Sequence, residues 1–164
     1  MQLSNGTWKV VPSPNATTGG ASTLQAVSCT TSTTCTAVGY SPTATLVEAL
    51  SGGIWTVVSS PNATTGSSYV NGVSCANASN CVAVGQSDDS SGDHTLVEIL
   101  SGGIWSVATA PDITRLNSVS CASATSCVAV GNTSIEQLLG GAWQIMPNPN
   151  ARNLESVSCI TSTP

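Results

Sequence analysis

The stretch LQAVSCTTSTTCTAVG at residues 24–39 decides the fold, because it returns along the chain in nearly the same form. The copies are VNGVSCANASNCVAVG at 70–85 and LNSVSCASATSCVAVG at 116–131, and a further copy begins as LESVSCITSTP at 154–164. Self-similarity at a fixed interval is typical of repeat architectures, in which each copy forms one structural unit. The chain is therefore read as an array of similar units.

A second block recurs between the copies of the first. TLVEALSGGIWTVVSSP at 45–61 returns as TLVEILSGGIWSVATAP at 95–111 and as SIEQLLGGAWQIMPNP at 134–149, and a partial copy opens the chain at 2–14. The first cysteines of successive units lie at positions 29, 75, 121 and 159, so the steps are 46, 46 and 38 residues. This period fits propeller blades, which have roughly 40–50 residues and four strands each.

Each unit predicts four short β-strands. The first ends in Val-Ser-Cys, the second is Cys-x-Ala-Val-Gly, the third is Leu-Val-Glu-x-Leu, and the fourth runs from Trp to Pro. Apolar residues alternate along the third and fourth strands, and helical periodicity is absent. A Gly-Gly pair before each Trp allows the positive φ angles of a tight hairpin: Gly52–Gly53, Gly102–Gly103 and Gly140–Gly141.

We therefore expect an all-β chain, a β-propeller with four-stranded blades of about 46 residues. A β-trefoil is the alternative, since it also contains three four-stranded units. A single array should occupy residues 1–164, with full blades at 24–61, 70–111 and 116–149 and partial blades at 1–16 and 153–164. The expected partner of Cys159 would be residue 165, so we expect either a fragment of a longer array or a subunit whose half blades another copy completes.

The repeat pattern L-x-x-V-S-C-x5-C-x-A-V-G, followed by G-x-x-W-x-V-x-x-x-P, resembles repeats of secreted actinobacterial proteins. These repeats look like β-propeller blades, distantly similar to the Asp-box and kelch-like classes. The chain departs from the Asp-box type because Ser-Gly-Gly-Ile precedes its Trp residues, and it lacks the Gly-His and Trp-Asp dipeptides of WD40 blades. The resemblance implies a fold and export from the cell, and it implies no particular activity.

The cysteines indicate disulfides within blades. Seven cysteines are present, and six form Cys-x5-Cys pairs: Cys29 with Cys35, Cys75 with Cys81, and Cys121 with Cys127. Five turn-forming residues between two cysteines let a hairpin bring their side chains within bonding reach. Zinc binding is the competing interpretation, but it favours closer cysteine pairs with histidine nearby. Disulfides predict an extracellular, oxidising location.

Composition excludes several classes of partner. Charged residues make up 7% of the chain, and the net charge is -5, which argues against nucleic acid. No apolar run is long enough to span a membrane. The start of the chain has neither a basic segment nor an apolar core, so any signal peptide would lie outside this sequence.

Ligand binding is expected on the loops that join the second strand to the third, and the fourth strand to the next unit. These loops vary in length among the units, and variable loops on a rigid scaffold commonly carry binding sites. The longest holds the candidate ligand-binding residues Asp88, Asp89, Asp93 and His94. We expect no cofactor, although clustered carboxylates also allow Ca²⁺.

We therefore expect a non-catalytic, secreted binding module with a glycan or protein ligand. The alternative is a structural subunit that forms homo-oligomers through its incomplete terminal blades. Catalysis is not expected, because the only histidine is His94 and the arginines and tyrosines are few and scattered.

Three recurring residue types have structural interpretations. We expect the tryptophans to form blade core instead of glycan-stacking platforms: Trp8, Trp55, Trp105 and Trp143. The repeated glutamates of the third strand could line an acidic channel, but we expect them to face solvent or to bind a backbone donor: Glu48, Glu98 and Glu136. The asparagines of the Asn-x-Ser/Thr sequences are interpreted as turn residues: Asn5, Asn15, Asn62, Asn77 and Asn132.

Overall fold

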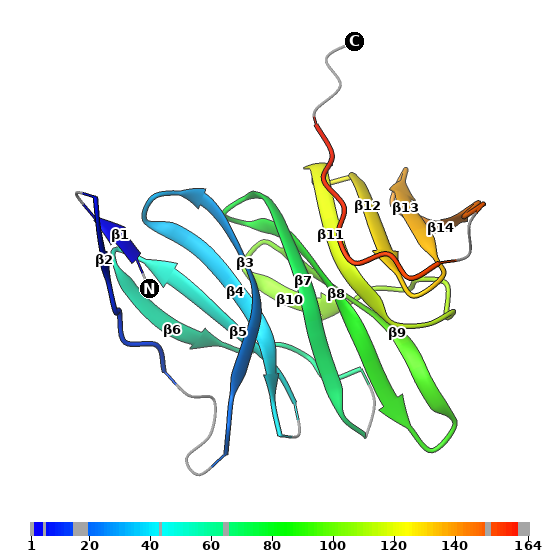
Figure 1. The fold of residues 1–164 in the computed structure, drawn as a ribbon, viewed down its shortest axis with the longest axis horizontal. Helices are drawn as coiled ribbons and strands as arrows, with labels where there is room; N and C mark the ends of the chain where they lie inside the picture. The colour runs from blue at the N-terminus through cyan, green and yellow to red at the C-terminus, as the bar shows by residue number, and fades with distance from the viewer. Residues whose placement is uncertain are drawn as a thin grey trace.

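The protein is all-β, as predicted. The structure, a computed structural model, describes residues 2–4, 6–14, 20–42, 44–63, 66–149 and 152–160. These residues form three four-stranded antiparallel sheets and a separate two-stranded hairpin (Figure 1). Within them, no helix has the length and apolar character needed to cross a membrane.

Each sheet is built from four strands that are consecutive in the sequence. The N-terminal hairpin consists of β1 (Gln2–Ser4) and β2 (Thr7–Lys9). The first sheet consists of β3 (Thr23–Thr31), β4 (Thr34–Ser41), β5 (Ala44–Ser51) and β6 (Ile54–Val58). The second consists of β7 (Ser68–Asn77), β8 (Asn80–Asp89), β9 (Gly92–Ser101) and β10 (Ile104–Val107). The third consists of β11 (Leu116–Ser123), β12 (Ser126–Gly131), β13 (Ile135–Leu139) and β14 (Ala142–Met146).

Two kinds of glycine explain recurring parts of the sequence pattern. Gly52 and Gly53 have φ angles of 59° and 87°, which only glycine adopts easily, and they form the turn from β5 to β6. Gly85, the last residue of the Ala-Val-Gly motif, lies against β7, where an added Cβ would stand 1.9 Å from the carbonyl oxygen of Tyr69. The motif therefore ends in glycine because two strands approach too closely for a side chain.

The predicted disulfides are present. The two cysteines of each pair lie directly opposite each other across the first hairpin of their sheet. The Cα–Cα distances are 4.0, 3.9 and 4.0 Å for Cys29–Cys35, Cys75–Cys81 and Cys121–Cys127. Cys159 carries a free thiol and is half-buried.

The three sheets pack face to face in an arc, with β3, β7 and β11 side by side (Figure 1). Apolar side chains fill the two junctions between the sheets. The first junction buries Val38, Val47, Val70, Val73, Leu96 and Trp105. The second buries Val84, Val97, Leu116, Val119, Leu138 and Trp143. Both faces of the second sheet are therefore covered by neighbouring sheets.

One hydrogen bond repeats at each step along the array. The backbone amide of the cysteine in one Val-Ser-Cys motif donates to the serine hydroxyl of the preceding motif. The bonds are 3.0 Å long and join Cys75 to Ser28, Cys121 to Ser74 and Cys159 to Ser120. The last bond holds residues 152–160 alongside β11, as Figure 1 shows. This segment continues the stacking of first strands beyond the third sheet.

The tryptophans differ in burial along the array. Trp105 and Trp143 are buried in the two junctions, and Trp55 is half-buried on the first sheet. Trp8 on β2 is 64% exposed. The hairpin that carries Trp8 has two strands where the sheets have four, so it offers less surface to cover the indole ring.

Two leucines at the same repeat position test the packing. Leu116 is fully buried in the second junction, whereas Leu24 is 41% exposed on the first sheet. Leu116→Ala should lower the free energy of unfolding by about 2–5 kcal/mol, because a buried leucine leaves a cavity. Leu24→Ala should lower it by less than about 1 kcal/mol, because solvent already reaches the side chain. Urea unfolding followed by tryptophan fluorescence measures both losses, and equal losses would contradict this packing.

Candidate functional site

The predicted ligand-binding loop is part of a β-hairpin, which corrects the sequence interpretation. Strand β8 continues to Asp89 and β9 begins at Gly92, with Asp88 paired opposite Asp93. The backbone ladder that holds such a hairpin does not depend on apolar side chains, so a polar sequence can still form strands. The four predicted residues consequently lie on a hairpin tip with defined register.

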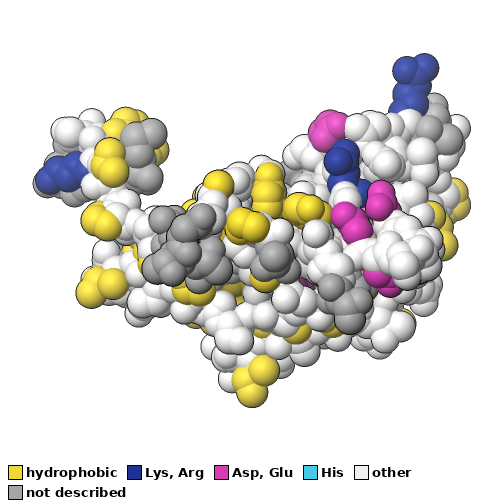
Figure 2. All heavy atoms as spheres, turned by 90° about the horizontal axis from the view of Figure 1, so that it is seen from below, with side chains coloured by type: hydrophobic (Ala, Val, Ile, Leu, Met, Phe, Trp, Pro, Cys, Tyr) yellow, Lys and Arg dark blue, Asp and Glu magenta, His cyan; other side chains and the backbone are white. Residues whose placement is uncertain are grey.

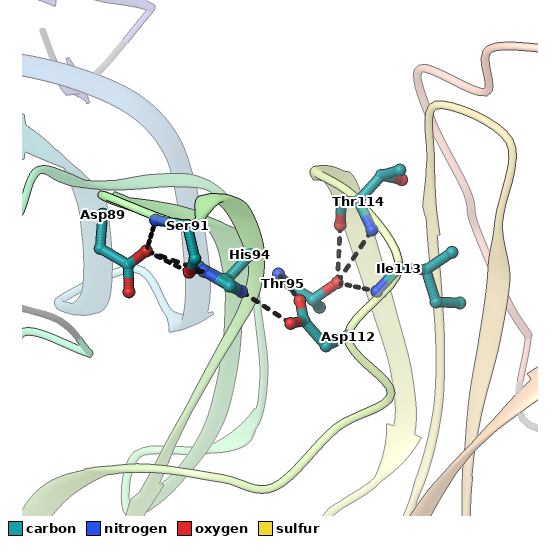
Figure 3. Close-up of polar contacts among 7 residues, drawn as sticks. All are labelled: Asp89, Ser91, His94, Thr95, Asp112, Ile113 and Thr114. Carbon is teal, nitrogen blue, oxygen red and sulfur yellow. Dashed lines mark hydrogen bonds and ion pairs between the residues drawn. The ribbon is translucent and has the colours of Figure 1, made fainter.

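His94 is the centre of a polar cluster at this tip (Figure 3). Its Nδ1 atom lies 2.6 Å from Oδ2 of Asp112, which belongs to the connection between β10 and β11. Its Nε2 atom lies 2.9 Å from the hydroxyl of Ser91 and 3.1 Å from Oδ1 of Asp89. The structure therefore brings together two of the predicted residues, Asp89 and His94, and adds two that the sequence interpretation missed.

The two carboxylates favour the protonated form of the imidazole. Hydrogen bonds to Asp112 and to Asp89 raise the pKa of His94. The side chain and amide of Ser91, with His94, lower the pKa of Asp89 to about 2. Hydrogen bonds from His94 and from the amide of Thr95 lower the pKa of Asp112. Both carboxylates thus stabilise the imidazolium form of His94 relative to its neutral form.

The distances from Ser91 to His94 and from His94 to Asp112 suit a serine, its base and an orienting carboxylate, but a second carboxylate, Asp89, competes for the serine proton. The hydroxyl of Ser91 donates to Oδ1 of Asp89 at 2.5 Å, so its proton points to the carboxylate. A protonated imidazole has no free lone pair to accept a proton from serine. The cluster instead links two connections that are distant in the sequence.

Thr95 and Asp112 fix the connection that leads into the third sheet. The amide of Thr95 donates to Oδ1 of Asp112 at 2.9 Å. The Thr95 hydroxyl accepts bonds from the amides of Ile113 and Thr114 at 3.1 and 3.2 Å. It also donates to the carbonyl oxygen of Thr114 at 2.7 Å. Thr95 thus holds three consecutive residues of the connection, Asp112 through its backbone amide and the next two through its hydroxyl.

A comparison between units shows which residues distinguish this cluster. In the first sheet, the amide of Thr45 donates to Oδ1 of Asn62 at 3.1 Å, at the position equivalent to Thr95 and Asp112. Residue 44 is alanine where the second unit has His94. The second unit therefore differs from the first at two positions, with histidine in place of alanine and aspartate in place of asparagine, and only the second unit has the His94–Asp112 pair. An alignment of the units is the signal that would have found Asp112.

The asparagines of the Asn-x-Ser/Thr sequences include turn residues, as predicted. Asn62 accepts the bond from Thr45, and Oδ1 of Asn77 accepts a bond from the amide of Ser79 at 2.9 Å. Asn132 is exposed. Asn5 and Asn15 lie outside the described residues.

A polar cleft of about 290 Å³ adjoins the hairpin tip, between the second and third sheets. Its lining comes from three separate connections and contains one predicted residue, Asp93. The lining residues are Gln86, Asp93, Thr114, Arg115 and Asn132. Asp88 is outside this lining but contacts it, since its Oδ1 accepts a bond from Nε2 of Gln86 at 3.0 Å.

Charged side chains gather on this face of the molecule. In Figure 2, acidic and basic side chains lie close together in the right half of the view, whereas hydrophobic side chains are most numerous in the left half and centre. Within the described residues, no group of three or more His, Cys, Asp or Glu side chains is placed to hold a metal ion. The polar residues that line the cleft include both hydrogen-bond donors and hydrogen-bond acceptors for a ligand.

The repeated glutamates are buried between units, so the expectation that they face solvent is wrong. Each lies on a third strand, on the side that faces the preceding unit: Glu48, Glu98 and Glu136. Glu48 accepts a bond of 2.6 Å from the hydroxyl of Ser13. The carboxylate oxygens of Glu98 and Glu136 have no hydrogen-bond partner in the described part of the chain.

Burial changes the acidity of two of these glutamates. Desolvation raises the pKa of Glu98 to about 8, against a smaller opposing influence of the Thr45 hydroxyl. Desolvation likewise raises the pKa of Glu136 to about 7. Both side chains are consequently neutral in mildly acidic solution, where a buried carboxyl costs least.

Comparisons with known proteins give no further guide to this site. The models of known protein families do not match the chain, and neither does any curated protein.

Glu98 should make stability depend on pH. Its pKa is raised on folding, so the folded state binds more protons and stability falls as pH rises from about 5 to about 8, by up to about 1.4 kcal/mol per pH unit. Glu98→Gln should flatten this slope and unfold at higher urea concentration than the unmodified protein near pH 8. Glu155→Gln, at an exposed position, is the matched control and should leave the slope unchanged. An unchanged slope in Glu98→Gln would refute the assignment.

Proposed function

We propose that the chain is a non-catalytic β-propeller segment that acts outside the cytosol and binds a polar ligand, of the glycan class, in the cleft between its second and third sheets. The single observation that carries this proposal is the cleft itself, with its five polar side chains from three connections. Amide, hydroxyl, carboxylate and guanidinium groups together offer donors and acceptors suited to a ligand rich in hydroxyl groups.

The arrangement of the sheets supports a propeller. Propeller blades are four-stranded sheets whose first strands lie side by side around an axis. Each sheet here pairs only strands that are consecutive in the chain, and β3, β7 and β11 adjoin one another. Three disulfides support an oxidising location.

The supports of the cleft favour binding over catalysis. The cleft borders Thr114 and Arg115, and the bonds from Thr95 and Asp112 hold their connection in place. A site held rigid before binding loses less conformational entropy when a ligand enters. His94 stabilises this support and, in its charged form, lacks the lone pair that a general base needs.

Arg115 provides the direct test. Arg115→Ala should weaken binding of the best ligand found on a glycan array about tenfold, because a charge-assisted hydrogen bond is lost. Arg152→Ala, which removes an exposed arginine outside the cleft lining, is the matched control and should bind as the unmodified protein does. Circular dichroism verifies the fold of each variant. Equal binding by the two variants, or no hit across the array from a folded protein, would overturn the proposal.

A further inference from the structure

The first sheet exposes an apolar face that the other two sheets bury. Leu24 and Val27 on β3 are 41% and 59% exposed. The residues at the same positions of β7, Val70 and Val73, are 0% and 9% exposed. Those of β11 are just as buried: Leu116 is 0% and Val119 is 6% exposed. The face of β3 thus carries the same kind of apolar side chains as the buried junctions, but within the described ranges no neighbouring sheet covers it.

The other junctions show what covers such a face. Strands β3 and β4 lie over β7, and β7 and β8 lie over β11. At each junction, the serine of the covering first strand accepts a bond from the cysteine amide of the covered one. The cover is therefore a strand with a Val-Ser-Cys end, held in one register by one hydrogen bond.

The space beside β3 is open where such a strand would lie. A groove of about 310 Å³ lies there, and it includes Leu24, Val27, Glu48 and Trp55. Ser13, from the chain that follows the β1–β2 hairpin, closes one side of it through its bond to Glu48. Within the described residues, no serine hydroxyl accepts a bond from the amide of Cys29.

The chain also contains a segment with the sequence of a covering strand, residues 152–160, which adjoins no fourth sheet in the described residues. Residues 152–160 lie along β11, where Nδ2 of the Asn117 side chain donates to the carbonyl oxygen of Leu154 at 2.9 Å and the backbone amide of Cys159 donates to the Ser120 hydroxyl. Ser158 in this segment occupies the motif position of Ser28, Ser74 and Ser120. The segment and the face of β3 lie at opposite ends of the arc (Figure 1), so they cannot meet within one molecule.

We propose that a second copy of this chain docks on the first sheet, with its residues 153–160 laid across Leu24 and Val27. In this arrangement, the Ser158 hydroxyl of one copy accepts the bond from the Cys29 amide of the other, which repeats the bond found at the interior junctions. The contact joins two different surfaces, the apolar face of β3 in one copy and residues 153–160 of the other. It is independent of the ligand-binding cleft, which lies between the second and third sheets.

Sedimentation velocity over a range of protein concentrations tests this contact. The experiment uses the full chain with Cys159→Ser, so that disulfides between free thiols cannot mimic association. The mass should rise above that of the monomer as concentration increases. Ser158→Ala should weaken the association about fivefold, since it removes one hydrogen bond.

Val27→Asp separates this contact from general loss of solubility or fold. It places a carboxylate in the docked face and should leave the protein monomeric and folded, because Val27 is exposed in the single chain. Ile104→Asp makes the same kind of change at a residue that is 73% exposed on β10, and it should associate as the parent does. A parent that stays monomeric at the highest concentration reached would overturn the proposal, as would a Val27→Asp variant that associates like its parent. Both results are independent of glycan binding.

Discussion

The structure depends on the packing of each sheet against its neighbour, which buries the apolar side chains between them. A four-stranded sheet of this length has two faces, and the second sheet buries both of them. The bond between the cysteine amide and the preceding serine fixes how far one sheet slides along the next, because only one register brings the two groups together. This arrangement explains a chain with only 7% charged residues, since few strand positions face water.

The polar groups of the chain are divided between two environments. Those at the hairpin tip near His94 are partnered and connect one unit to the next. Those in the junctions are glutamates, which burial keeps protonated over part of the ordinary pH range. A junction that contains a neutral carboxyl packs like an apolar one, and the same carboxyl becomes a cost when it ionises. The buried carboxyls of the junctions are thus one place where pH acts on this fold, whereas the polar cleft is where a ligand would act.

Much of the fold could be predicted from the sequence, because local rules govern it. The five residues between cysteines predicted the disulfides, and the glycine pairs predicted the hairpins. The burial of Glu98 could not be predicted, since alternation along a strand shows two faces without showing which neighbour covers each. The pairing of His94 with Asp112 does not follow from the sequence pattern, because the two residues are 18 positions apart, with most of β9 and all of β10 between them. The extension of β8 to Asp89 could not be predicted, because the polar side chains there lack the apolar alternation of a strand.

Hydrogen exchange at single cysteine amides tests most directly whether the serine–cysteine bond joins neighbouring units. In Ser74→Ala, the amide of Cys121 should exchange faster than in the unmodified protein, because Ser74 is its acceptor. The amide of Cys75 should keep its rate, because its acceptor is Ser28. Nuclear magnetic resonance resolves both amides in one sample. A Cys121 amide that exchanges at the same rate with and without the Ser74 hydroxyl would contradict this account of how the units are held together.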